Sequence, residues 1–144
     1  GLFRKPLGGM TVSECLRRYQ TGGLRRLTDD KPFEDVILSG RTPQKEREIA
    51  DHPSLKPQAF LRRIVHASLP LGEGIVLDPF MGSGSTIAAA EAIGARGIGI
   101  ERFSDYFEMA GEAVPKLRDL LVEDDVDVPS IPVKTDQPNL NFQW

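Results

Sequence analysis

The sequence has few of the residues and patterns that define several large classes of protein. It contains one cysteine, Cys15, and two histidines among 144 residues. An internal disulfide is therefore impossible, and a usual structural zinc site would lack its ligands. There is no apolar run near the roughly 18 residues that a membrane span requires, and no signal-peptide pattern at the start. These absences predict a cytoplasmic globular protein without a metal, a disulfide or a membrane partner.

The sequence also lacks a strong excess of charge, because 18 Lys and Arg stand against 21 Asp and Glu, a formal net charge of −3. The two halves differ, however. Residues 1–70 carry 13 basic and 8 acidic side chains, a net +5, and residues 71–144 carry 5 and 13, a net −8. The first half is a candidate surface for a polyanion such as DNA, although an ordinary solvated mixture of charges gives the same count.

The first half of the chain shows little periodic pattern. Thr11 and Glu14 have the spacing of a capping box, which predicts a short helix over about residues 12–20. The apolar run at 35–38 predicts a short strand. The polar stretch 41–57 is interrupted by prolines and is predicted to be mostly irregular.

Two helices are predicted from apolar residues at helical spacing. Pro57 suits the first residue of a helix. The second helix covers 104–121, and Pro115 is expected to kink or loosen it. The residues expected to face inward are Phe60, Leu61, Ile64 and Val65 in the first helix, and Phe107, Ala110, Val114, Leu117 and Leu121 in the second.

Between these helices the pattern predicts a βαβ unit. A short buried strand at 74–78 is followed by glycines, a strong helix former at 85–94, and a second strand at 96–101. This order implies parallel strands and the α/β class. Two strands do not complete such a sheet, so the sheet is predicted to be incomplete in this chain. From 123 to 144, charge, prolines and the absence of a period predict an extended or disordered tail.

The stretch "DPFMGSGST", residues 78–86, joins the first strand to its helix. Gly82 and Gly84 have no Cβ, so the backbone there is able to approach a ligand closely. The helix that follows offers unpaired N–H groups and the positive end of a dipole. An anionic or acceptor group is therefore expected near residues 83–86. The lysine of a phosphate-binding loop is missing.

Two acidic residues narrow the choice of ligand. Asp78 ends the first strand, where its carboxylate would favour an ammonium group. Glu101 ends the second strand, at the spacing where an acid of Rossmann-like folds binds ribose hydroxyls. A ligand with a ribose, an ammonium and a carboxylate but no phosphate is S-adenosyl-L-methionine. Each acid also has a plainer explanation, because Asp78 could cap the turn and Glu101 could be a solvated charge.

The stretch that begins "HPSLKPQAFLRRIV", continues through "DPFMGSGST" to "GIGIE" and is followed by "DYFEMA" resembles the C-terminal part of bacterial site-specific DNA amino-methyltransferases. These are the permuted, beta-class enzymes that methylate adenine N6 or cytosine N4. The pieces "LFRKPL", "TGGLRR" and "SGRTPQKEREIA" are similar to the segment before that region. The resemblance covers about residues 3–121. It implies a partial Rossmann-like S-adenosylmethionine-dependent methyltransferase fold, S-adenosyl-L-methionine as cofactor, and double-stranded DNA with a flipped base as substrate.

The resemblance also implies the residues of a cofactor site. Lys56 would meet the carboxylate of the methionine end, Asp78 its ammonium, Phe80 the sulfonium side and Glu101 the ribose. Ser85 stands where most relatives have Thr, a mild departure since both offer a hydroxyl. The full set of matching positions is His52, Pro53, Lys56, Pro57, Asp78, Pro79, Phe80, Gly82, Ser83, Gly84, Ser85, Thr86, Glu101 and Arg102.

The catalytic loop of the family, [DSN]PP[YFW], has no counterpart here, since the sequence contains no Pro-Pro pair. In the permuted order this loop precedes the region that the resemblance covers. The chain is therefore expected to be the C-terminal portion of a methyltransferase and inactive alone, with no catalytic residue of its own. Its expected divisions are a basic irregular segment, 1–51, a cofactor-binding βαβ region, 52–122, and the tail, 123–144.

Several alternatives stay open at this point. An incomplete sheet favours a homo-oligomer or a partner chain that completes it. The product is expected to be N6-methyladenine by analogy, with cytosine N4 as the other option. A non-catalytic remnant or regulatory subunit that binds S-adenosylmethionine, and a binder of another nucleotide, are the competing functions. If the chain is part of a DNA methyltransferase, the candidate contacts to DNA phosphates are Arg17, Arg18, Arg25, Arg26, Arg41 and Arg47.

Overall fold

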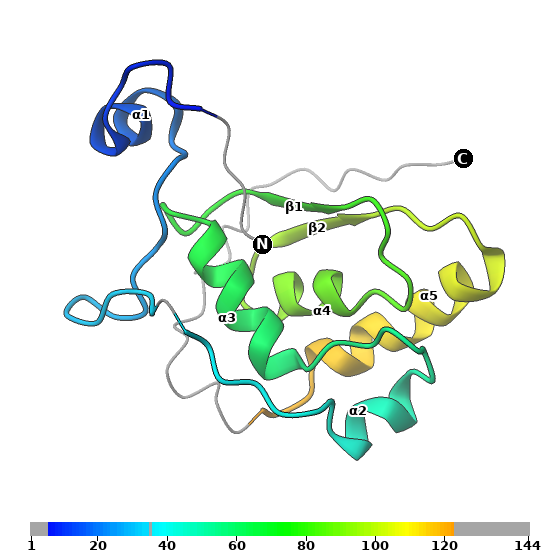
Figure 1. The fold of residues 1–144 in the computed structure, drawn as a ribbon. Helices are drawn as coiled ribbons and strands as arrows, with labels where there is room; N and C mark the ends of the chain where they lie inside the picture. Colours follow the sequence, from blue (N-terminus) through cyan, green and yellow to red (C-terminus); the bar gives the residue numbers. More distant parts are fainter. Residues whose placement is uncertain (1–5, 35, 123–144) are drawn as a thin grey trace.

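The computed structural model describes residues 6–34 and 36–122 of the chain. The predicted tail at 123–144 lies outside the described residues. Figure 1 shows the arrangement of the helices and strands. In chain order they are α1 (Val12–Tyr19), α2 (Gln44–Ile49), α3 (Gln58–Ser68), β1 (Ile75–Asp78), α4 (Ser85–Ala92), β2 (Arg96–Gly99) and α5 (Ser104–Arg118).

The predicted βαβ unit is confirmed. Strands β1 and β2 are parallel, with Ile75 opposite Arg96 and Asp78 opposite Gly99. Helix α4 connects them and packs on both strands, and α3 and α5 pack against α4. In Figure 1 these three helices lie on the same side of the strands, whereas α1 stands away from them. The carboxyl ends of both strands therefore meet at the start of α4 and α5.

Helix α4 occupies the middle of the hydrophobic core. Its alanines Ala88, Ala89 and Ala90 are fully buried, and their small side chains let neighbouring helices approach closely. One apolar cluster joins α4 to α3 through Leu61 and Val65. The other cluster joins α4 to α5 through Ala88, Ala113 and Leu117. The expected inward face of α3 is thus confirmed at Leu61 and Val65, Phe60 is partly buried against the same cluster, and Ile64 is half-buried.

The prediction that 74–78 is a buried strand is wrong for one of its two faces. On that face Leu77 is 60% exposed and pairs with Ile98, which is 42% exposed. Side chains of a strand alternate between its faces, and helices cover only the other face here. We call the exposed face, made of Ile75, Leu77, Ile98 and Ile100, the outer face of the sheet.

The first half of the chain departs from prediction in one place. Residues 36–38 form no strand, and Val36 and Leu38 are exposed; within 6–34 and 36–122 no strand pairs with them, and position 35 lies outside the described residues. The stretch 41–57 is mostly irregular as predicted, but it also contains a helix that was not predicted, α2. Its residues, Gln, Lys, Glu and Arg, are good helix formers that the surrounding prolines had obscured.

Helix α5 is shorter than predicted, since it ends at Arg118. It runs through Pro115 as one helix. Ala110 and Leu117 are buried as expected, but Phe107 and Leu121 are exposed. Leu121 lies beyond the end of the helix, where helical spacing no longer applies. Phe107 lies in the first turns of α5, a region that Figure 1 shows extending past the sheet and the other helices.

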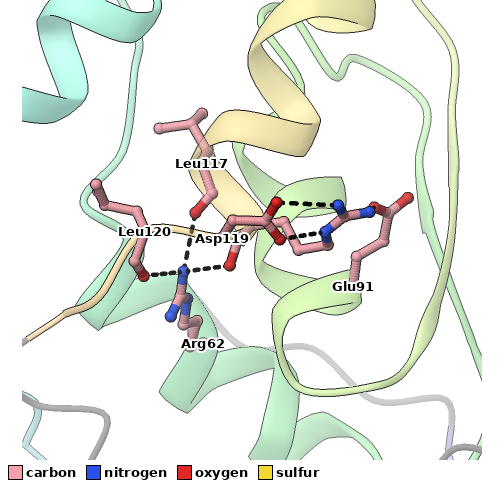
Figure 2. Close-up of polar contacts among 6 residues, drawn as sticks. Arg62, Glu91, Leu117, Asp119 and Leu120 are labelled. Atoms are coloured by element: carbon pink, nitrogen blue, oxygen red, sulfur yellow. Dashed lines mark hydrogen bonds and ion pairs between the residues drawn. The ribbon is translucent and has the colours of Figure 1, made fainter.

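The end of α5 is fixed by a buried arginine of α3. Arg62 is only 4% exposed. Its Nη2 donates to the carbonyl oxygens of Leu117 at 2.9 Å, Arg118 at 3.1 Å and Leu120 at 3.0 Å (Figure 2). Carbonyls at a helix end lack the regular N–H partners of the helix interior, and a cation at this end complements the helix dipole. Arg62 therefore ties α5 to α3, and both helices border the loop that follows β1.

Candidate functional site

Residues 79–84, here called the glycine loop, connect β1 to α4. Gly82 and Gly84 have φ values of +54° and +78°, in the left-handed region that favours glycine. The Gly84 N–H donates to the Met81 carbonyl at 2.9 Å, and the Met81 N–H donates to the Ile100 carbonyl at 3.0 Å. The loop is therefore fixed to the residue that follows β2.

Close packing is a second reason why both positions require glycine. A Cβ on Gly84 would overlap Val114 and lie 3.3 Å from the Cβ of Ala110, so α5 packs directly on the loop. A Cβ on Gly82 would lie 2.8 Å from Cε1 of His52. The sequence predicted that a ligand approaches the backbone at Gly82 and Gly84 closely. In the structure, side chains of the protein itself make part of this close approach.

Asp78 lies at the end of β1 and is half-buried. Its Oδ1 accepts a hydrogen bond from the Phe80 N–H at 3.1 Å. This is the turn-capping role that the sequence had left open for this residue. The bond uses one acceptor site of the carboxylate, and an ionised carboxylate has about four. Capping therefore leaves room for a further contact to a cation.

Glu101 holds the glycine loop from the other strand. Its Oε1 accepts from the Phe103 N–H at 2.9 Å, and its Oε2 accepts from the Gly82 N–H at 3.0 Å. These backbone hydrogen bonds, from Phe103 first and then from Gly82, lower the pKa of Glu101. Each oxygen keeps a lone pair. The group is thus an oriented, ionised carboxylate with two acceptors still available.

His52 lies against the loop within a group of aromatic rings. Its ring meets that of Tyr106 edge to face, 4.4 Å between centroids, and Tyr106 meets Phe103 at 6.1 Å. The Nδ1 of His52 accepts from the Ser54 N–H at 3.1 Å, so the proton of a neutral ring lies on Nε2. Tyr106 and Phe103 were missed by sequence reasoning, although the aromatics after "GIGIE" were a visible signal.

Three hydroxyl residues lie where the loop enters α4. Ser83 is 1% exposed, and its Oγ has no hydrogen-bond partner within the described part of the chain. Ser85 is buried, and its carbonyl oxygen accepts from Nε2 of Gln58 at 2.9 Å. Thr86 is half-buried. The buried Ser83 hydroxyl is a free polar group at the positive end of a helix, which suits an anionic ligand.

The remaining predicted site residues are exposed or make their contacts away from the glycines of the loop. The Nζ of Lys56 donates to the Ser54 carbonyl at 2.7 Å, within its own segment. Phe80 is 87% exposed. Pro57 is the N-cap residue of α3. The guanidinium of Arg102 lies over the Phe103 ring at 5.4 Å. Pro53 and Pro79 are exposed. The structure thus brings together His52, Gly82 and Glu101 most tightly.

The six candidate phosphate contacts differ in exposure. Arg25 packs over Gly72 and is only partly exposed, and the other five are exposed. Three of the five make contacts of their own: Arg18 lies over the Tyr19 ring at 5.3 Å, Arg26 donates to the Asp30 carbonyl at 3.4 Å, and Arg47 donates to Oε1 of Gln44 at 3.1 Å. Long basic side chains on an exposed surface are free to reach a polyanion, so the five exposed arginines are better candidates than Arg25.

Two features are not found in the described ranges, 6–34 and 36–122. No group of three or more His, Cys, Asp and Glu side chains is placed to hold a metal ion there. No helix of those ranges has the length and apolar character needed to cross a bilayer.

Residues 11–112 match the model of a family described as DNA methylase. The chain is 38% identical over 92 residues to the Type II methyltransferase M2.DpnII of Streptococcus pneumoniae, and 33% identical over 93 residues to M2.LlaDCHI of Lactococcus lactis subsp. cremoris. These alignments cover 64% and 65% of this chain and 34% of each relative. The chain thus spans about a third of their length.

The chain is also similar to solved structures, among them the M1.HpyAVI–SAM complex, with a TM-score of 0.51 and 30% sequence identity. The match covers 68% of this chain and 44% of that one.

Proposed function

Because the chain belongs to the DNA methylase family, whose model it matches over residues 11–112, we propose that its glycine loop binds S-adenosyl-L-methionine. The proposed region is 52–122, with the rest of the methyltransferase machinery supplied from elsewhere. The observation that carries the proposal is the Glu101 carboxylate, which two backbone N–H groups hold beside the loop. The solved relative named above is itself a complex with SAM.

Glu101 is suited to a ribose. Its two oxygens each retain a lone pair after the bonds to Gly82 and Phe103. Two vicinal hydroxyls donate to two such acceptors in parallel, as acids at this position do in Rossmann-like folds. The lowered pKa of Glu101 keeps these acceptors ionised at neutral pH. The aromatic group of His52, Tyr106 and Phe103 borders the same place.

The start of α4 is suited to the methionine end of S-adenosyl-L-methionine. Its carboxylate would meet the N–H groups at residues 83–86, the positive end of the helix dipole and the unpartnered Oγ of Ser83. Its ammonium would meet the half-buried carboxylate of Asp78, which is available beyond its bond to Phe80. The ammonium of Lys56 would reach the carboxylate of the cofactor only after it breaks its hydrogen bond to the Ser54 carbonyl oxygen.

When bound, the cofactor supplies a methyl group that passes from its sulfonium to an exocyclic amine. In this proposal Asp78 and Glu101 orient it and do not act as acid or base. The substrate is a flipped base of double-stranded DNA, with adenine N6 favoured and cytosine N4 as the alternative. The proposed phosphate contacts, supported by their exposure, are Arg17, Arg18, Arg26, Arg41 and Arg47.

The proposal assigns no catalytic residue to this chain, because the sequence has no Pro-Pro pair. The chain alone is proposed to be inactive, and a second copy or a partner chain is proposed to complete its sheet. A cytoplasmic location, expected from the lone cysteine, is part of the same proposal. The missing pair also favours a second candidate, a non-catalytic module that binds S-adenosylmethionine. Finding [DSN]PP[YFW] in the encoded segment upstream would favour the enzyme over this module.

The test is a competition experiment on the folded chain. Labelled S-adenosyl-L-methionine is equilibrated with the protein, and S-adenosylhomocysteine, ATP and NAD are added separately in excess. The proposal predicts displacement by S-adenosylhomocysteine alone, because a triphosphate would lie beside Asp78 and lacks a lysine partner in the loop. Displacement by ATP or NAD at equal concentration would reject it in favour of a general nucleotide site.

A further inference from the structure

Two fully buried polar side chains form a chain of contacts that reaches the first turn of α4, and neither takes part in the proposed cofactor contacts. Glu46 of α2 and Gln58 of α3 are both 0% exposed. Oε2 of Glu46 accepts a hydrogen bond from the backbone N–H of Gln58 at 3.0 Å. Nε2 of Gln58 then donates to the Ser85 carbonyl at 2.9 Å. The chain of contacts therefore runs from α2 through α3 to the first residue of α4.

The hydrogen bond from the Gln58 N–H to Glu46 replaces a missing cap at the start of α3. Helix α3 begins at Gln58 after Pro57, whose side chain makes no capping hydrogen bond. The N–H of Gln58 is one of the donors that a helix start leaves without a partner. Glu46 supplies the acceptor from a different helix, and its carboxylate also suits the positive end of the α3 dipole. The start of α3 is thereby fixed relative to α2.

The second contact reaches the glycine loop. Ser85 directly follows Gly84, which is the N-cap of α4 and is held by Met81. The Ser85 carbonyl is at the start of α4, so a donor from α3 fixes the direction of that first turn. The N–H groups expected to meet a carboxylate belong to the same turn and to the residues just before it.

Packing alone does not explain why these two residues are polar. Each keeps a buried oxygen, Oε1, that has no hydrogen-bond partner within 6–34 and 36–122. Such an oxygen costs stability, and an apolar side chain of similar volume would avoid the cost. Burial also raises the pKa of Glu46, while Lys45 and Arg62 act against this shift. A costly arrangement at this place indicates that its hydrogen bonds have a use.

We propose that Glu46 and Gln58 are positioning residues for the glycine loop. Glu46 fixes the start of α3, and Gln58, placed by it, fixes the first turn of α4 so that the loop's N–H groups keep one direction. This inference rests on the proposed function only in what the loop binds. The positioning itself concerns the ligand-free chain.

The test compares local and global stability in variants of the 144-residue chain. Gln58→Met keeps the volume and removes the donor to Ser85. Val65→Ala, on the same helix and in the core, lowers global stability without touching these hydrogen bonds. Amide hydrogen exchange of residues 82–86 is measured by NMR, and global stability by urea unfolding.

We expect Gln58→Met to speed exchange at residues 82–86 by about tenfold beyond its effect on global stability. Val65→Ala should change these amides only in proportion to the global loss. Glu46→Leu should act like Gln58→Met, whereas Glu46→Gln, which keeps an acceptor for the Gln58 N–H, should restore slow exchange. Loop exchange that follows global stability in all variants, or Glu46→Gln behaving like Glu46→Leu, would overturn the proposal.

A titration with S-adenosyl-L-methionine separates this inference from the proposed function. Weaker binding by Gln58→Met than by Val65→Ala would support both. Local loosening in a chain whose wild type binds no S-adenosyl-L-methionine would support the positioning pair and reject the proposed ligand.

Discussion

Among the proposed site residues, Glu101 has the most constrained carboxylate. Backbone N–H groups on two sides fix both of its oxygens, and its pKa is lowered by them. Asp78 is less constrained, because its bond to Phe80 is an ordinary turn cap. Both acids were predicted as site residues from their places at strand ends. The hold of Glu101 on Gly82 could not be predicted, because it depends on how the loop folds back over β2.

Asp78 has two roles that substitution separates. Asp78→Asn keeps an oxygen that accepts from the Phe80 N–H but loses the charge that would attract an ammonium. We expect this variant to fold normally and to bind S-adenosyl-L-methionine about tenfold more weakly, equivalent to about 1.4 kcal/mol. Asp78→Ala should weaken binding at least as much and also loosen the turn. Calorimetric titration checks both, and unchanged affinity in Asp78→Asn would remove Asp78 from the site.

Glu101 should also give the chain a pH dependence of defined sign. Its pKa is lower in the folded chain than in the unfolded one. Its contribution to stability is therefore complete above the ordinary pKa of a glutamate and is lost as the pH falls through the lowered value. Urea unfolding across this acidic range should show a smaller decline for Glu101→Gln than for the wild type. Parallel declines would mean that the carboxylate makes no such contribution.

Among the elements, the glycine loop with α4 and α5 was the most predictable. Its glycines, its helix former and its strand ends all lie close together in sequence. Helix α2 and the exposed segment 36–38 were less predictable, because their state depends on partners that lie far along the chain. Glu46, for example, is buried where its carboxylate meets the start of α3, twelve residues further along the chain. The missed role of Gln58 has the same cause.

Gly84→Ala tests the contact between the loop and α5. The new methyl group meets Val114 and must adopt a left-handed φ of +78°. We expect a loss of about 2–4 kcal/mol in urea unfolding, from backbone strain and overpacking together. Adding Val114→Ala should recover only the packing part.

Gly111→Ala is the matched control in the same helix pair. Gly111 is inside α5, and a methyl group added there would point into open space, with no atom of a neighbouring element within 4 Å. This change should raise stability by up to about 1 kcal/mol. A Gly84→Ala variant as stable as Gly111→Ala would contradict the described packing of the loop on α5.

At the scale of the whole molecule, the main feature of the described residues is a two-stranded sheet whose outer face is exposed. The predicted incomplete sheet is confirmed, because only two parallel strands lie in the part of the chain that the structure describes. It could not predict which face is covered, because the strands are too short and too apolar for an alternating pattern. The α/β class with parallel strands is confirmed, and the solved relative places it among methyltransferase folds.

The outer face is expected to drive association of the isolated chain. Leu77 and Ile98 are paired neighbours there, and exposed apolar surface favours contact with a second copy. Sedimentation velocity should show concentration-dependent association that Leu77→Ser with Ile98→Ser reduces. Leu38→Ser, at an even more exposed site outside the sheet, should leave it unchanged. A wild-type chain that stays monomeric at high concentration would contradict this expectation.

The central claim is that the glycine loop and Glu101 form a site for S-adenosyl-L-methionine, and calorimetric titration tests it most directly. The wild-type chain should bind in the low micromolar range, about −8 kcal/mol. Glu101→Gln should weaken binding at least about tenfold, since one ribose acceptor becomes a donor. Glu108→Gln, an exposed change of equal charge on α5, should have no effect. A folded wild-type chain that does not bind, or equal affinity in Glu101→Gln, would contradict the claim.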